Sequence, residues 1–366
     1  MAPRKKTGLQ MNSAISTEHS PRASTRSSAS RWATVLMAGT MLILAFAATE
    51  GCTNSSGKPK SGKLQVLATT AMVGDVVKAV GGDAIEVTVL LGPGVDPHLY
   101  KTTRDDVAQI LDADVVFYSG LMLEGKMSDT FAKVGKSKPV FAVTEDLDHD
   151  KLLSDSQQTG HPDPHVWFDV ELWSLTANQV AEVLGEQLPE HLDTFAMNSS
   201  NYQSDLRDLA ADAKAALATI PEDQRILITS HDAFGYLGRA YGIEVMGVQG
   251  ISTDSEAGLQ RINELVDLIV EKQVPAVFVE TSVNGKSIQA LIDGARSRGH
   301  AVKIGGELFS DAAGEAGTYE GTYPGMIDHN VTLITRALGG EAPENGLRGK
   351  LSMDAETTAE TSNVPN

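Results

Sequence analysis

The feature that most constrains the fold is a regular alternation of short β-branched runs with longer helical stretches. In the first half of the chain, the apolar runs at 64–69, 86–91, 114–119 and 139–144 are candidate strands. Residues 71–82 and 102–113, which lie between them, carry apolar side chains at helical spacing. Because near-continuous apolar strands need cover on both faces, the pattern predicts a parallel sheet flanked by helices.

The second half of the chain repeats this alternation. Its candidate strands are 225–230, 244–249, 276–281 and 300–305. Its candidate helices are 234–242, 256–273 and 285–299. We therefore predict an α/β protein of two lobes, each with a roughly four-stranded parallel sheet flanked by helices.

One long helix is predicted to join the lobes. Pro189 suits a first helical turn. Apolar side chains then recur at steps of three, four or seven, at Phe195, Tyr202, Leu206, Leu209, Ala213, Leu217 and Ile220. A helix over 189–220 would be roughly 45 Å long at 1.5 Å per residue, which makes a rigid link. The alternative is two helices broken near Ser199.

Shifts in composition set the remaining boundaries. We assign 1–51 to a leader, 52–63 to a flexible linker, 64–188 to the N-terminal lobe and 221–338 to the C-terminal lobe. The acidic segment 339–366 has few large apolar residues and is predicted to be a disordered tail.

The N-terminal segment carries the marks of an export signal. A basic, Ser/Thr-rich start precedes the apolar stretch Trp32–Thr49, and Cys52, the only cysteine of the chain, follows Gly51. This pattern indicates a lipoprotein signal with Cys52 as the lipidated residue. The alternatives are cleavage near Ala45, which leaves a free thiol, and an uncleaved anchor. We expect an exported protein in the periplasm or on the membrane surface of the cell envelope.

The net charge of the chain limits the classes of partner that it can bind. The formal net charge is -18, and the leader is basic, so the remaining surface is more acidic still. Such a surface repels nucleic acid and suits a cationic ligand. The sequence therefore predicts no nucleic-acid partner.

Four side chains form a candidate metal site. His98 and His165 each lie in an Asp-Pro-His turn, where proline keeps the preceding aspartate extended and near the ring. His231 and Asp311 each follow a candidate strand, where ligands of parallel sheets collect. Three imidazoles and one carboxylate suit a divalent first-row metal. Four protein ligands leave no open position, which favours holding over catalysis.

Several other groups near these motifs allow more than one interpretation. Glu280 ends the strand 276–281 and is either an outer hydrogen-bond acceptor for a ligand imidazole or a structural carboxylate. His161 is a candidate for an auxiliary metal site. The sequence assigns no definite role to His149 or His161. His329 is expected on a terminal helix, and Trp167 is expected to pack beneath His165.

The motifs that carry these residues resemble a known family. They are GPGVDPHLYKTTRDDV, DPHVWFDV, TSHDAFGYLGRAYG, VQGISTDSEAG, VFVETSV and LFSDAAGEAGTYEGTYPGMIDHN. Over about 64–338 the chain resembles the cluster A-I solute-binding proteins of zinc and manganese ABC importers, the TroA/ZnuA/PsaA-like metal-binding lipoproteins. The resemblance implies two lobes joined by one long helix, with metal held between them by His98, His165, His231 and Asp311. It also implies a membrane permease with a cytoplasmic ATPase as partners, and a monomer.

The donor set bears on which metal is carried. Family members tuned to manganese often have a carboxylate where this chain has His231, so a third imidazole favours zinc. Zinc transporters of this family also have a long His-rich loop, whereas residues 144–165 hold only His149 and His161 besides His165. We expect zinc, with manganese as the alternative.

The leading function is a receptor and not an enzyme. One alternative is an exported zinc-dependent hydrolase with Glu280 as general base, although no HExxH motif is present. A second alternative is a cell-adhesion protein with a structural metal, which should unfold when the metal is removed.

Overall fold

The computed structural model describes residues 62–154 and 160–352. The leader, Cys52 and nearly all of the linker 52–63 lie outside the described residues. Within the part that is described, no helix is both long and apolar enough to cross a membrane.

The N-terminal lobe is built on a parallel four-stranded sheet of order β2-β1-β3-β4. Its strands are β1 (Leu64–Ala68), β2 (Ile85–Val89), β3 (Val115–Tyr118) and β4 (Val140–Ala142). Val66 of β1 lies opposite Val87 on one side and Val115 on the other. The parallel sheet predicted for this lobe is confirmed.

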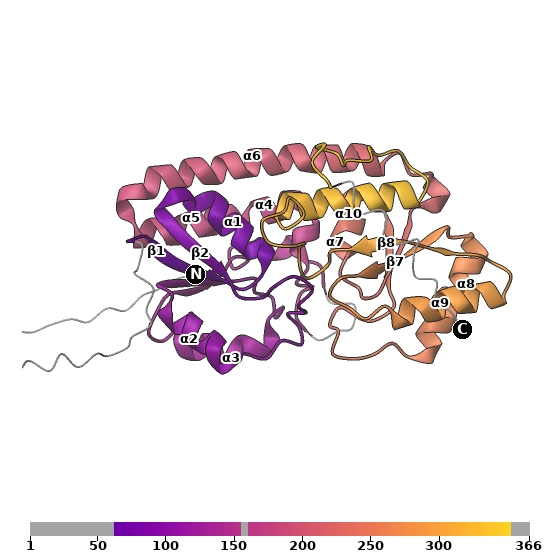
Figure 1. Cartoon of the computed structure of the whole chain (residues 1–366), viewed down its shortest axis with the longest axis horizontal. Helices are drawn as coiled ribbons and strands as arrows, with labels where there is room; N and C mark the ends of the chain where they lie inside the picture. The colour runs from indigo at the N-terminus through magenta and orange to yellow at the C-terminus, as the bar shows by residue number, and fades with distance from the viewer. Residues whose placement is uncertain (1–61, 155–159, 353–366) are drawn as a thin grey trace, which may run out of the picture. The chain divides into compact units, whose positions relative to one another are not determined.

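Helices cover both faces of this sheet, as Figure 1 shows. They are α1 (Ala71–Gly81), α2 (Arg104–Asp112) and α3 (Ser128–Val134). Because successive strand residues face opposite sides, Val66 packs in the core cluster of α1, whereas Leu67 packs with Ile110 and Phe131 of α2 and α3. The short helix α3 was not predicted from the sequence.

The C-terminal lobe has the four strands expected from the sequence, but they form two parallel pairs. These are β5 (Ile226–Thr229) with β6 (Glu244–Gly247), and β7 (Ala276–Glu280) with β8 (Lys303–Leu308). Strands β5 and β7 lie side by side, yet no ladder joins the two pairs within the described residues. The structure therefore has two two-stranded sheets where one sheet of roughly four strands was predicted. Apolar periodicity identifies strands but does not show which strands pair with each other.

The three helices that lie between these strands in the sequence pack against them. They are α7 (Gly235–Tyr241), α8 (Leu259–Lys272) and α9 (Lys286–Ser297). Leu265 and Ile269 of α8 and Leu291 of α9 share a buried cluster with Ile228 and Val277 of the strands. This core is separate from the larger cluster, which includes Val66 of the N-terminal lobe and also Phe278 and Leu308 of the C-terminal lobe.

The predicted linking helix is present as α6 (Leu192–Leu217), preceded by a 3-10 turn at Pro189–His191. Its 26 residues span about 39 Å at 1.5 Å per residue. Figure 1 shows it running past both lobes beside α10. The helix is unbroken near Ser199, because Asn198 donates to the carbonyl of Val80 (2.9 Å) and Ser199 to the amide oxygen of Asn178 (3.3 Å).

Further helices complete the fold. They are α4 (Val170–Ser174), α5 (Thr176–Gln187) and the terminal helix α10 (Tyr323–Ala337), which carries His329 as expected. Helices α4 and α5 were not predicted from the sequence. Both lie against α6, so they help to attach this helix to the N-terminal lobe.

Residues 339–352 were expected to belong to a disordered tail, but the structure describes them. Residues 339–352 are ordered against α10, where the buried carboxylate of Asp328 accepts hydrogen bonds from the backbone N–H groups of Leu347 (2.7 Å) and Arg348 (3.2 Å). Leu347 also packs on the main core. One buried acceptor and one leucine thus hold a segment whose composition alone indicates disorder. Residues 353–366 lie outside the described part.

A carboxylate between α1 and α6 makes stability depend on pH. Burial raises the pKa of Asp75 from 3.8 to about 6, although Tyr202 donates to it at 3.0 Å. Its ionised form is therefore less stable in the folded protein than in the unfolded chain. This penalty is absent below pH 4 and complete above pH 6, so the Asp75 contribution lowers stability as pH rises.

We expect Asp75→Asn to stabilise the protein by on the order of 2 kcal/mol at pH 7.5 and to have little effect at pH 4. Urea unfolding of both proteins at the two pH values, with a chelator present, measures the difference. Asp83→Asn, at an exposed carboxylate, is the control and should change stability equally little at both. A pH-independent gain for Asp75→Asn would show that ionisation is not the cause.

Candidate metal centre

His98 is placed by the loop between β2 and α2. The Asp96 carboxylate accepts a hydrogen bond from the backbone N–H of His98 at 2.8 Å, which closes a tight turn around Pro97. Gly94 has a φ of +68°, in the left-handed region that favours glycine. The His98 ring is 5% exposed.

His165 is held by the aspartate of its own Asp-Pro-His turn. Oδ1 of Asp163 accepts from the backbone N–H of His165 (3.0 Å) and lies 2.7 Å from its Nδ1. Both side chains are buried. Trp167 follows in a 3-10 turn and packs edge-on against the imidazole, as expected. Asp163 therefore leaves the Nε2 atom of His165 free for a metal.

His231 and Asp311 come from the carboxyl ends of strands in the C-terminal lobe. His231 follows β5, and Glu280 at the end of β7 contacts it twice. The Glu280 carboxylate lies 2.5 Å from Nδ1 and accepts from the backbone N–H at 2.8 Å. Asp311 follows β8 and is 1% exposed. Glu280 thus lies where an outer acceptor for a ligand imidazole was expected.

The four predicted ligands converge on one point. His165 Nε2 lies 3.3 Å from His98 Nε2 and 3.4 Å from His231 Nε2. The Asp311 carboxylate oxygens lie 3.2 Å from His165 Nε2, 3.3 Å from His231 Nε2 and 3.9 Å from His98 Nε2. One ligand atom from each residue lies within 4.8 Å of all the others.

These spacings fit a metal ion. An ion bound at 2.0–2.1 Å in tetrahedral geometry separates its ligand atoms by about 3.3 Å. With Nδ1 of His165 and His231 on carboxylates, the neutral rings present their Nε2 lone pairs to one point, where a cation would bind them. Both buried oxygens of Asp311 also lack a hydrogen-bond donor of good geometry among the described residues.

The pKa of His98 is shifted in the opposite direction from the pKa values of His165 and His231. Burial lowers the pKa of His98 to about 3, with Asp311 opposing it. Burial also disfavours the charged form of His165, but Asp163 and Asp311 outweigh it and raise the pKa to about 9.

The pKa values of His231 and Asp311 are also shifted by their charged neighbours, in opposite directions. Burial opposes charge on His231, yet Glu280 and Asp311 raise its pKa well above the usual value. Burial would raise the pKa of Asp311, but His231 and His165 hold it well below the ordinary range. Without metal, protons on His165 and His231 balance the carboxylates, whereas His98 is neutral. A bound metal would take the place of those protons.

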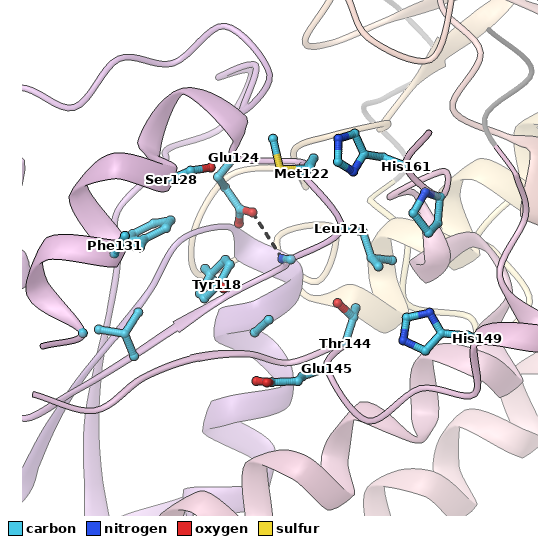
Figure 2. Close-up of a pocket in the computed structure, with 16 residues that line it drawn as sticks. Tyr118, Leu121, Met122, Glu124, Ser128, Phe131, Thr144, Glu145, His149 and His161 are labelled. Carbon is cyan, nitrogen blue, oxygen red and sulfur yellow. Dashed lines mark hydrogen bonds between the residues drawn. The ribbon is translucent and has the colours of Figure 1, made fainter. Parts of the chain in front are cut away.

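The other histidines of the described residues do not join this cluster. His300 and His329 contact the carbonyls of Val274 (2.8 Å) and Glu307 (3.0 Å). His149 and His161 are exposed, and Figure 2 shows both rings at one side of a pocket that carries Tyr118 on its other side. No second group of three metal-binding side chains lies in the described part of the chain.

This donor set, buried between two α/β lobes that one helix joins, defines the class of bilobed solute-binding proteins that capture a metal ion for an ABC importer. The family model described as "Zinc-uptake complex component A periplasmic" (ZnuA) matches residues 66–337. The chain belongs to this family.

Similar proteins include one relative named for manganese and one named for zinc. The chain is 48% identical over 298 residues to the "Manganese-binding lipoprotein MntA" of Bacillus subtilis (strain 168), covering 81% of this chain and 97% of the relative. It is 44% identical over 299 residues to the "Zinc-binding protein TroA" of Treponema pallidum (strain Nichols), covering 81% and 96%.

Solved structures agree with this assignment. The periplasmic zinc-binding protein TroA from Treponema pallidum superimposes with a TM-score of 0.73 at 45% identity, covering 76% of this chain and 99% of that one. The relatives and this structure carry names of metal-binding or transport proteins, and none of these names describes an enzyme.

Proposed function

We propose that the metal carried is Zn²⁺, or alternatively Mn²⁺, and that His98, His165, His231 and Asp311 bind it for delivery to a membrane permease with a cytoplasmic ATPase. The observation that carries this proposal is the convergence of four buried ligand atoms, from both lobes, within 4.8 Å. A site built by two lobes suits capture and release, because a small change in their spacing alters the coordination.

Zinc is favoured by the chemistry of the donors. MntA and TroA are named for different metals, so the relatives do not decide between them. Three imidazoles are softer ligands than carboxylates, and a site of N and O donors generally binds Zn²⁺ more tightly than Mn²⁺. The near-tetrahedral spacings also suit Zn²⁺.

Holding fits this site better than hydrolysis. A hydrolytic zinc site keeps one position open and needs a free general base. Here Glu280, the candidate base of the alternative, is 3% exposed and engaged with His231. A purely structural metal is also disfavoured, because the lobes contain large apolar cores away from the site.

The location of the protein follows from its leader and family. Several relatives are named as lipoproteins, which supports a lipid anchor at Cys52. We infer that the protein acts as a monomer tethered outside the cytoplasmic membrane, where the permease is within reach.

Elemental analysis and competitive titration of the purified protein test the metal. We expect one Zn²⁺ per chain and a higher affinity for Zn²⁺ than for Mn²⁺. His231→Glu should shift the ratio of affinities toward Mn²⁺, because a carboxylate is a harder donor. An unchanged ratio would count against the donor argument, and the absence of tight binding of either metal would refute the function.

A further inference from the structure

His98 is anchored differently from the other two imidazoles. His165 and His231 each have Nδ1 on a buried carboxylate. For His98, residues 62–154 and 160–352 supply no carboxylate within hydrogen-bonding distance of Nδ1. Its position therefore depends on its loop, which Asp96 closes through the backbone N–H of His98.

Asp96 also reaches across to the other lobe. Its second oxygen accepts a hydrogen bond from Oγ1 of Thr253 at 2.5 Å. Thr253 lies in the loop before α8 of the C-terminal lobe and is 9% exposed. The next residue, Asp254, forms an ion pair with Lys126 of the N-terminal lobe. We call these two contacts the interlobe clasp.

The backbone of the His98 loop lies close to the C-terminal lobe as well. A Cβ atom at Gly94 would lie 3.3 Å from the carbonyl oxygen of Thr281. The loop thus contacts the C-terminal lobe at Gly94 and at Asp96. Any separation of the lobes on this side would carry the loop away from His231 and Asp311 of the C-terminal lobe.

The opposite side of the site is tied by buried contacts. Nε1 of Trp167 donates to the carbonyl of Ser310 at 3.1 Å, and the hydroxyl of Tyr323 donates to the carbonyl of Trp167 at 2.7 Å. The hydroxyl of Tyr236 donates to the carbonyl of Asp163 at 2.9 Å. These bonds hold the His165 segment to the C-terminal lobe.

The two sides therefore differ in how easily they open. The Lys126 and Asp254 side chains are 31% and 53% exposed, so water readily replaces their contact. The bonds of Trp167, Tyr236 and Tyr323 are buried, and breaking them leaves polar groups unsatisfied. Because all four ligands are 5% exposed or less, the metal leaves only when one side opens.

We propose that the interlobe clasp is the seam through which the metal leaves, and that Asp96 and Thr253 are positioning residues that set the release rate by holding His98 in place. This inference rests on the proposed function, since it describes how the same site retains its metal. The clasp residues do not touch the metal themselves.

Thr253→Val tests the clasp, because valine keeps the shape of threonine and replaces its hydroxyl with a methyl group. We expect zinc to leave about tenfold faster, since the lost bond is to a charged acceptor. Stopped-flow measurement with excess chelator gives the release rate. The cobalt absorption spectrum should keep its four-ligand intensity, which shows that the ligands remain in place. Thr253→Ser, which keeps the hydroxyl, should release zinc at the wild-type rate.

Arg239→Gln is the matched control on the opposite side. Arg239 forms a partly exposed ion pair with Asp169 at 2.9 Å, between the lobes but near the His165 segment. Its loss should leave zinc release unchanged. The proposal is overturned if Thr253→Val releases zinc at the wild-type rate, or if Arg239→Gln accelerates release equally. A wild-type protein that binds neither Zn²⁺ nor Mn²⁺ tightly would instead refute the proposed function, and the clasp with it.

Discussion

Replacing His231 with alanine is expected to lower zinc affinity by more than about a hundredfold. Removing an outer hydrogen-bond partner of a metal ligand typically costs roughly 10–100-fold, and removing the ligand itself must cost more. His231 supplies one of three imidazole nitrogens, and its neighbours His165 and Asp311 lie 3.4 Å and 3.3 Å from it. No other described histidine is near enough to replace it.

The fold should survive this change. His231 lies at the junction of the lobes, whereas Leu265 and Leu291 belong to an apolar core elsewhere in the C-terminal lobe. Competitive titration gives the affinity, and circular dichroism with thermal unfolding checks the structure. His300→Ala, in the same lobe but bonded to the carbonyl of Val274, is the control and should bind normally. Zinc affinity within tenfold of wild type would remove His231 from the ligand set.

Glu280→Gln is expected to weaken zinc binding by roughly 10–100-fold, although Glu280 is not a proposed ligand. Its buried carboxylate orients His231 through Nδ1 and the backbone N–H. Glutamine keeps the size of the side chain but removes the negative charge. That charge makes the imidazole more basic and therefore a stronger metal ligand. The effect should therefore appear in metal affinity more than in folding.

Asp328→Asn provides the comparison for this second prediction. Asp328 is a buried carboxylate of the same lobe that accepts backbone hydrogen bonds and touches none of the site histidines. We expect it to alter stability and to leave zinc affinity within a few-fold of wild type. Equal losses of affinity in both variants would mean that Glu280 acts only through the stability of the lobe.

The two Asp-Pro-His turns show how far local sequence reasoning extends. Both were expected to keep an aspartate near its imidazole. Asp163 does so, at 2.7 Å from the Nδ1 of His165. The Asp96 carboxylate instead binds the backbone N–H of His98 and the hydroxyl of Thr253. The two Asp-Pro-His turns therefore anchor their histidines differently. In the first turn the aspartate binds Thr253 of the other lobe, a contact that the local sequence does not reveal.

The C-terminal lobe shows the same limit at the level of the fold. Its strands were found from β-branched runs, since burial on both faces requires them. Their division into β5-β6 and β7-β8 depends on hydrogen bonding between strands that are distant in sequence. The order of residues 339–352 likewise depends on the buried Asp328, which composition does not reveal.

The sequence by itself determined the α/β architecture, the long helix and the four residues worth testing as ligands, because periodicity and turn chemistry are local properties. Only the tertiary structure decided that their ligand atoms meet within 4.8 Å, that Glu280 and Asp163 orient two rings, and that Thr253 spans the lobes to Asp96. These are relations between segments separated by tens of residues, and their distances are set by the packing of the two lobes against one another.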